Sequence, residues 1–237
     1  MSTVELVVPS WSRLVATSGD AAVWLADLDA ADAGEEALAA LSDDERARAG
    51  RFVFDVHRRR FIACRAWLRG QLGERLGRAA HDLRFEYGPL GKPSLAGNPL
   101  RFNVSHSDRY ALLGVADAEI GIDIERQRPL SDMDALAERV FSVGERDALA
   151  RVAAGQKEEA FFAGWTRKEA YIKARGDGIG LLGAIEVVLA PGEPARLIAV
   201  DGQPAELERW SIQALSAVPG FAAAVCLEGQ GRHWTSV

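Results

Sequence analysis

The chain has 237 residues, 48% of them hydrophobic and 26% charged, an ordinary globular composition that allows one large domain or two small ones. Its net charge of −6 argues against a general nucleic-acid binder, because a phosphate backbone attracts a basic surface. No apolar run approaches the length of a transmembrane helix, and residues 1–14 lack the pattern of a signal peptide. We therefore expect a cytoplasmic protein without membrane spans, in which Cys64 and Cys226 are buried thiols.

The chain repeats one order of elements twice. An apolar strand, predicted over 23–28 in the first half and 120–125 in the second, precedes a Ser-x-x-Glu helix start at Ser42 and Ser142. Longer helices are then predicted at 52–76 and 158–175, followed by strands at 83–87, 102–105 and 110–116 in the first half and at 184–189, 210–214 and 222–227 in the second.

This repetition favours an α+β fold with a pseudo-two-fold duplication. Residues 1–117 and 118–237 would form two similar halves, each a small antiparallel sheet packed with a long helix. The interface between such halves is a natural place for a ligand. Because one chain supplies both halves, we expect a monomer.

One predicted strand carries two acids on a single face. In Gly-Ile-Asp-Ile-Glu, at residues 121–125, carboxylates alternate with isoleucines. In a strand, Asp123 and Glu125 would share one side while the isoleucines enter the core. The alternative is an edge strand whose carboxylates face water.

A predicted helix forty residues further along could meet this acidic face. The segment Trp-Thr-Arg-Lys-Glu-Ala-Tyr-Ile-Lys, at 165–173, stacks Trp165, Glu169 and Lys173 along one side. If the helix crosses the strand, three carboxylates converge, and a cation among them would relieve their repulsion; an all-oxygen shell suits Mg²⁺. The alternative is a surface pair of Glu169 and Lys173, contributing about 0.3–0.5 kcal/mol.

Further polar elements suggest an anion site. Ser105 and His106 end a predicted strand in a polar turn, where a hydroxyl and an imidazole can donate hydrogen bonds to phosphate. Lys92, in a Gly-Lys-Pro turn, could reach a phosphate as well. A basic run at 57–60 begins the first long helix and could face an anion, although a solvated basic face is the more common explanation.

Together these motifs resemble the Sfp-type 4′-phosphopantetheinyl transferases. The resemblance rests on the Gly-Ile-Asp strand, the Trp-x-x-Lys-Glu-Ala-x-x-Lys helix, and the upstream Gly-Lys-Pro and Phe-Asn-x-Ser-His-Ser elements. It covers about residues 42–181, and the length suits the pseudo-dimeric class rather than the half-length trimeric synthases. It implies Mg²⁺-dependent transfer of the phosphopantetheine arm of coenzyme A to a serine of an apo acyl or peptidyl carrier protein, with release of 3′,5′-ADP.

The resemblance also implies residue roles. Asp123, Glu125 and Glu169 would hold Mg²⁺, and Lys173, Lys92, Ser105, His106, Arg48 and Arg60 would contact the coenzyme A phosphates. Catalysis would involve Glu169, Lys173 and Glu145. The acceptor of the serine proton stays open between Glu169, Glu145 and a metal-bound water relayed to Glu145.

Carrier proteins are acidic helical bundles, so we expect residues 126–140, which mix arginines with apolar side chains, to form their docking surface. The main alternative function is a Mg²⁺-dependent hydrolase of a coenzyme A or nucleotide pyrophosphate. A catalytically silent binding module is disfavoured. Such a module would be expected to have lost an acid or the lysine of the site, and this chain retains them. The pathway served, nonribosomal peptide, polyketide, siderophore or fatty-acid synthesis, stays open.

Overall fold

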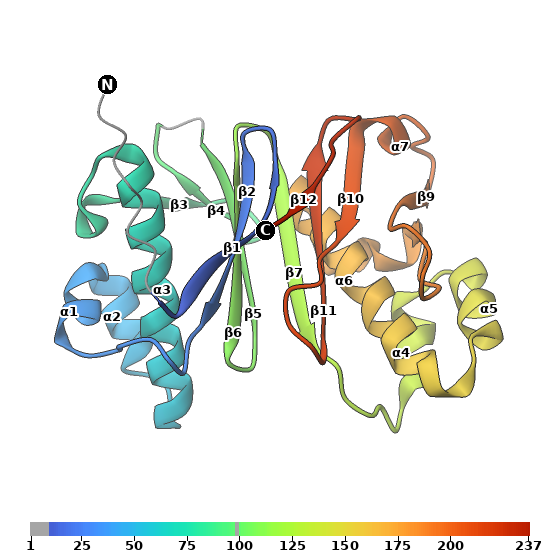
Figure 1. Ribbon diagram of the computed structural model, residues 1–237, viewed down its shortest axis with the longest axis horizontal. Coiled ribbons are helices and arrows are strands. Elements are labelled where there is room, and N and C mark those ends of the chain that lie inside the picture. Colours follow the sequence, from blue (N-terminus) through green and yellow to red (C-terminus); the bar gives the residue numbers. More distant parts are fainter. Residues whose placement is uncertain (1–9, 98–99) are drawn as a thin grey trace.

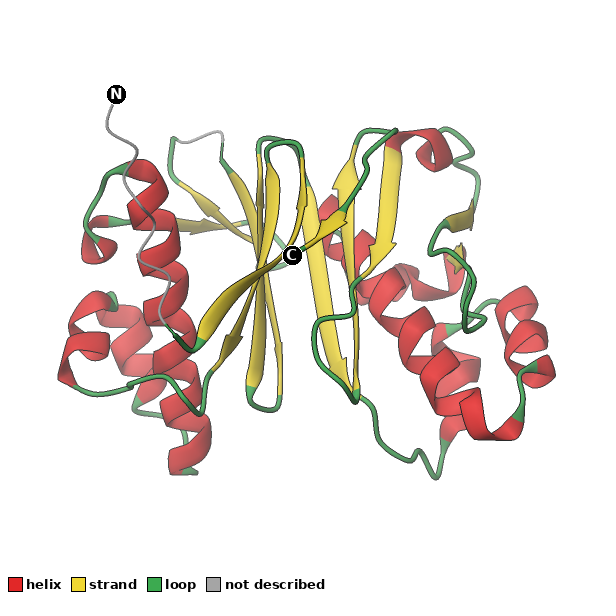
Figure 2. Ribbon diagram, in the orientation of Figure 1, coloured by secondary structure: helices red, strands yellow, loops and turns green. Residues whose placement is uncertain are grey.

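Two antiparallel sheets stand side by side in the centre of the molecule, and helices cover their outer flanks (Figures 1 and 2). The computed structural model describes residues 10–97 and 100–237, so most of the stretch judged unlike a signal peptide lies outside the described residues. In the described part, no helix is long and apolar enough to cross a membrane.

The first half contains two strands, three helices, a short 3₁₀ helix and four further strands. They are β1 (Ser12–Ser18), β2 (Ala21–Asp27), α1 (Glu35–Ala40), α2 (Asp43–Ala49), α3 (Asp55–Leu76), η1 (Ala80–Asp82), β3 (Phe85–Tyr87), β4 (Pro93–Leu95), β5 (Arg101–Ser107) and β6 (Tyr110–Ala116).

The second half repeats this order from β2 onward, with added short elements. They are β7 (Ile120–Arg126), α4 (Met133–Val140), α5 (Val143–Arg151), η2 (Ala154–Gln156), α6 (Lys157–Arg175), η3 (Ile179–Ala184), β8 (Ile185–Val187), β9 (Leu197–Val200), α7 (Glu206–Arg209), β10 (Trp210–Ala214), β11 (Phe221–Glu228) and β12 (Thr235–Ser236).

The strand order confirms the predicted duplication. The first sheet has the order β12-β1-β2-β6-β5 and the second has the order β10-β11-β7, so β2-β6-β5 corresponds to β7-β11-β10. All these neighbours pair antiparallel. One strand crosses the expected division after residue 117: β12, at the end of the second half, pairs with β1 of the first. It covers backbone groups that the β1 edge would otherwise expose.

Matching caps frame the helices of both halves. Ser42 and Ser142 each begin a helix with a complete capping box, as the Ser-x-x-Glu pattern predicts. The long helices α3 and α6 both end at a left-handed glycine, Gly77 with φ 60° and Gly176 with φ 76°.

The position of β7 is set by close packing on both of its faces. Ile122 and Ile124 are fully buried in a core shared with strands of the first half. On the other face Gly121 lies directly against α6, where a Cβ atom would sit 2.1 Å from the carbonyl oxygen of Ala170. Only glycine permits this approach, which brings the acids of β7 next to α6.

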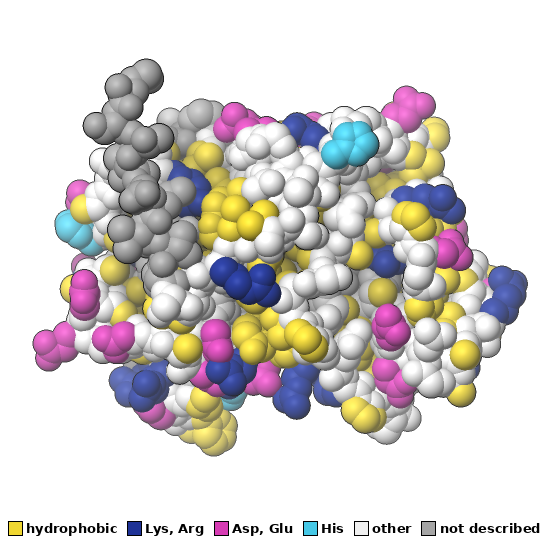
Figure 3. All heavy atoms as spheres, viewed as in Figure 1, with side chains coloured by type: hydrophobic (Ala, Val, Ile, Leu, Met, Phe, Trp, Pro, Cys, Tyr) yellow, Lys and Arg dark blue, Asp and Glu magenta, His cyan; other side chains and the backbone are white. Residues whose placement is uncertain are grey.

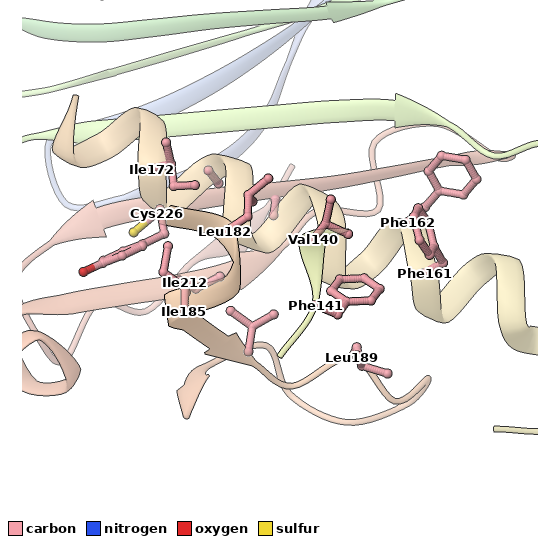
Figure 4. Packing of buried hydrophobic residues seen from close by; sticks show 14 of the residues in the cluster. Val140, Phe141, Phe161, Phe162, Ile172, Leu182, Ile185, Leu189, Ile212 and Cys226 are labelled. Atoms are coloured by element: carbon pink, nitrogen blue, oxygen red, sulfur yellow. The ribbon is translucent and has the colours of Figure 1, made fainter. Parts of the chain in front are cut away.

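A second core lies between α6 and the second sheet. Figure 4 shows Phe161, Phe162 and Ile172 of α6 beside Phe141 and Cys226. Both cysteines are buried, as predicted. Burial raises the pKa of the Cys64 thiol to about 11, so this thiol is an inert packing group.

Candidate active site

Strands β5 and β7, one from each half, lie side by side where the halves meet. Polar side chains spaced two residues apart on β5 reach across to β7. The bonds join Asn103 Oδ1 to the amide of Ile122 at 2.9 Å, Ser105 Oγ to Asp123 Oδ1 at 2.8 Å, and Ser107 Oγ to Glu125 Oε2 at 2.8 Å. Side chains of the first half therefore orient both acids of the second half. We call this contact the seam.

Asp123 is the centre of the seam. It is 2% exposed, and its Oδ1 accepts hydrogen bonds from Ser105 and from Lys173 Nζ, the latter at 2.5 Å. Lys173 Nζ also lies 3.2 Å from Ser105 Oγ. Burial raises the pKa of Asp123, and the nearby Lys173 offsets part of that effect. Its other oxygen, Oδ2, is buried without a hydrogen-bond partner among the described residues.

Glu125 and Glu169 share the electrostatic environment of Asp123. Burial raises the pKa of Glu169, and the charges of Asp123 and Glu125 raise it further. The pKa of Glu125 is likewise raised, first by burial and then by Asp123. Helix α6 packs against β7, and the charges of both strand acids act on its glutamate.

A bound cation would have to draw these acids closer together. Within residues 10–97 and 100–237, no group of three or more His, Cys, Asp and Glu side chains has the geometry to hold a metal ion. Lys173 provides the neutralising charge at Asp123. The donor set nevertheless fits a hard divalent cation, because it offers carboxylate oxygens, three acids with raised pKa values and the unpartnered Asp123 Oδ2. The metal assignment stays a prediction.

Three cationic or polar groups predicted to contact phosphate lie near one another. Desolvation by neighbouring groups lowers the pKa of His106, although part of its side chain is exposed, and the positive charges of Lys173 and Arg48 lower it further. The Arg48 guanidinium lies over the Phe61 ring at 5.2 Å from its centroid. The charges of Lys173 and Arg48 therefore both act on His106.

Lys92 lies beside the seam, next to the C-terminus of α6. Its Nζ donates to Glu119 Oε2 and to the carbonyl of Ala174, both at 2.7 Å. It lines a cavity of about 220 Å³ together with Asn103 and Lys173. Two of the predicted phosphate-binding lysines therefore face one cavity that both halves enclose.

Arg60 is held by two acids, Asp29 just after β2 and Asp108 just after β5. Its guanidinium binds both carboxylate oxygens of Asp29, at 2.7 and 2.8 Å, and Asp108 at 2.6 Å. Asp108 follows Ser107 directly, in a left-handed conformation with φ 54°, and also binds Arg126 at 3.0 Å. Arg60 would have to exchange these partners to contact a phosphate.

Glu145 has a different environment from the seam acids. Its Oε1 accepts from the Val187 amide at 2.9 Å, and its Oε2 accepts from the Ser142 amide at 2.9 Å and from Lys168. Lys168, which is fully buried, also donates to the Val140 carbonyl at 2.7 Å. Both oxygens of Glu145 are therefore occupied in joining α5 to α6 and β8, and the structure does not bring this residue into the acid cluster.

Sequence reasoning did not assign Asn103 and Ser107 to the site. A signal was present, because Asn103, Ser105 and Ser107 alternate with the period of a strand, as the acids of β7 do. Two alternating polar faces of neighbouring strands would be expected to pair.

The chain has an α+β fold of two matched halves, and acids, lysines and serines gather where the halves meet. These two features define the class of molecule. Residues 119–226 match the model of the 4′-phosphopantetheinyl transferase superfamily, and residues 31–118 match that of the 4′-phosphopantetheinyl transferase N-terminal region. The chain belongs to the 4′-phosphopantetheinyl transferase family.

Two relatives matched by sequence agree with this assignment. The chain is 43% identical over 230 residues to the 4′-phosphopantetheinyl transferase HetI of Nostoc sp., covering 94% of each protein. It is 27% identical over 195 residues to the 4′-phosphopantetheinyl transferase Sfp of Bacillus subtilis, covering 81% of this chain and 84% of Sfp. A holo-(acyl-carrier-protein) synthase from Bacillus anthracis, solved in complex with CoA (3′,5′-ADP), is 29% identical with a TM-score of 0.38 and covers 48% of this chain and 97% of that one.

Proposed function

We propose that this chain transfers the 4′-phosphopantetheine moiety of coenzyme A to a serine of an apo acyl or peptidyl carrier protein, with Mg²⁺, and releases 3′,5′-ADP. Family membership supports the transfer reaction. The observation that carries the site assignment is the contact of Asp123 with Ser105 and Lys173, which joins a carboxylate of one half to a hydroxyl of the other. Because one chain supplies both halves of the site, the monomer is the proposed active unit.

Asp123, Glu125 and Glu169 would hold the metal ion. When bound, Mg²⁺ would neutralise charge on the pyrophosphate and make its displacement less costly. In phosphoryl transfer the protein contributes mainly by positioning groups and by stabilising charge. The hydroxyls of Ser105 and Ser107 fix two of the three carboxylates for this task.

Lys173, Lys92, His106 and Arg48 are the proposed contacts of the coenzyme A phosphates. Lys173 lies between the acids and the cavity that it shares with Lys92, so its ammonium can serve the pyrophosphate from its present position. His106 is proposed for the 3′-phosphate. Burial and the positive charges of Lys173 and Arg48 lower its pKa, and a bound phosphate would favour the protonated imidazole.

Glu169 is the proposed acceptor of the serine proton. In the metal-free protein burial raises the pKa of Glu169 and Lys173 offsets part of that effect. A bound Mg²⁺ would lower the pKa again, so a metal-bound water is the alternative acceptor. Glu145 is a weaker candidate, since both of its oxygens already accept hydrogen bonds. As the serine oxygen bonds to the β-phosphorus, the bond from that phosphorus to the bridging pyrophosphate oxygen breaks and 3′,5′-ADP leaves.

Incubation with coenzyme A, Mg²⁺ and a panel of apo-carrier proteins, followed by intact-mass measurement, tests the proposal. We expect one phosphopantetheine added per carrier, no addition in EDTA, and no addition to a carrier whose acceptor serine is replaced by alanine. Failure to modify any carrier would overturn it. Release of 3′,5′-ADP without a carrier would support the pyrophosphate hydrolase instead.

A further inference from the structure

Three large apolar side chains are exposed within four residues at the start of α3. Val53 is 89% exposed, Phe54 is 66% exposed and Val56 is 46% exposed. Elsewhere in the described chain, the large apolar side chains that are this exposed are single residues, apart from the pair Tyr87 and Leu90, so the group at 53–56 is the largest in sequence. Clustered apolar exposure of this kind marks an interaction site, whereas single exposed apolar residues are normal. We call Val53, Phe54 and Val56 the 53–56 patch.

The surroundings of the 53–56 patch are basic. Arg51, Arg58 and Arg59 are all exposed beside it, and of these Arg58 pairs with Asp55 at 2.6 Å. The lower left of Figure 3, below the start of α3 in Figure 1, shows an apolar protrusion next to Lys and Arg side chains. The chain as a whole carries a net charge of −6, so this local basic excess runs against its average. Such a surface complements an acidic partner.

The 53–56 patch adjoins the proposed active site. Arg60, one turn further along α3, binds Asp108 at 2.6 Å, and Asp108 directly follows the seam residue Ser107. Arg48, shortly before the patch in sequence, lies close enough to affect the pKa of His106. A partner seated on the patch would therefore hold its nearest residues at the end of the seam.

The segment expected from sequence to dock carrier proteins has fewer exposed apolar groups. Leu130, Met133 and Leu136, within 126–140, pack against the core of the second half. Arg126 at its start is paired with Asp108. The exposed apolar side chains near the seam thus belong mainly to the first half.

We propose that the 53–56 patch, with Arg51, Arg58 and Arg59, docks the acidic helical face of the carrier protein; this rests on the proposed transferase function. An amphipathic helix with apolar side chains and surrounding carboxylates matches an apolar patch ringed by arginines. The patch holds the carrier while the seam acts on its serine. Its residues therefore govern the KM for the carrier and leave coenzyme A binding unaffected.

The test compares steady-state kinetics of the full-length enzyme and of the double variant Val53→Ser/Phe54→Ser. Phe54 is the N-cap residue of α3, and serine is a favourable N-cap, so the variant is expected to fold. We expect the KM for apo-carrier to rise about 10-fold or more, as for loss of an aromatic anchor. The kcat and the KM for coenzyme A should stay within about two-fold of the wild type.

Ile198→Ser is the control, because Ile198 is an exposed apolar side chain on β9 of the second half; its carrier KM should not change. If the wild type modifies carriers and the patch variant has an unchanged carrier KM, the docking proposal is overturned and the proposed function stands. A wild type that modifies no carrier would overturn both. A wild-type dimer, seen by light scattering, that the patch substitutions convert to a monomer would assign the patch to a second copy and overturn the proposal.

Discussion

The hydroxyl of Ser105 donates to Oδ1 of Asp123 at 2.8 Å, and this bond joins the two halves of the duplicated fold at the acid cluster. Lys173, on α6, donates to the same carboxylate oxygen. The three residues come from β5, β7 and α6, so the proposed site requires both halves to be folded and in contact. β5 and β7 are not counterparts in the duplication, so each half contributes a different strand, with hydroxyls on β5 and acids on β7.

Asp123→Asn should abolish transfer and leave the fold intact. The substitution keeps the shape of the side chain but removes the charge proposed to hold the metal, so we expect the transfer rate to fall about 100-fold or more. The raised pKa of Asp123 means that its charge is disfavoured in the metal-free protein, so the melting temperature should not fall greatly. Intact-mass measurements give the transfer rate, and electron paramagnetic resonance gives the affinity for Mn²⁺. Thermal unfolding gives the melting temperature.

The control for Asp123 is Asp134→Asn, which removes an exposed carboxylate from α4. Its rate and its Mn²⁺ affinity should equal those of the wild type. An Asp123→Asn enzyme with full activity would contradict the metal assignment.

Ser107 is expected to act by positioning Glu125. Its hydroxyl donates to Glu125 Oε2 at 2.8 Å and accepts from the Arg126 amide at 3.1 Å, which fixes the carboxylate relative to the backbone of β7. Ser107→Ala should weaken Mn²⁺ binding about 10-fold, as removal of a partner of a metal ligand typically does. Ser107→Thr keeps the hydroxyl and should restore the affinity. Equal Mn²⁺ affinity in the wild type and Ser107→Ala would rule out this role.

Sequence patterns predicted the duplication, the acidic face of β7 and its meeting with α6, because strand and helix periods determine which side chains share a face. They did not anticipate β12, whose two residues form a strand only by pairing with the edge of β1. The different roles of Glu145 and Glu169 could not be separated either. Whether a glutamate's oxygens are already occupied depends on tertiary partners, here Lys168 and Val187.

Glu145→Gln should reduce stability more than catalysis. The change weakens the acceptor of the buried Lys168 ammonium, and breaking a buried ion pair costs about 3–5 kcal/mol. Urea unfolding should show that loss, while the folded enzyme keeps its kcat and the pH dependence of its kcat. The double variant Glu145→Gln/Lys168→Met removes both charges and should recover part of the stability. A stable Glu145→Gln enzyme with a kcat lowered about 100-fold would instead support Glu145 as the general base.

Glu45, the counterpart of Glu145 in the first half, should make folding stability depend on pH in the acid range. Burial disfavours its charge, but Arg65 and Arg69 outweigh this and hold the pKa of Glu45 below its usual range. In the unfolded chain the carboxyl binds protons more readily than in the folded protein, so its contribution is present at neutral pH and is lost as pH falls through the folded pKa.

Glu45→Gln should therefore destabilise the protein at neutral pH by about 3–5 kcal/mol, because two buried or half-buried guanidinium groups lose their partner. The difference from the wild type should shrink as pH falls, since the wild-type carboxyl then becomes neutral as well. Free energies of unfolding in urea at several pH values measure this. Asp43→Asn is the control, because Asp43 pairs with Arg46 on the exposed side of the same helix turn and should have little effect at any pH. A Glu45→Gln deficit that stays constant from neutral to acid pH would show that its ionisation does not stabilise the fold.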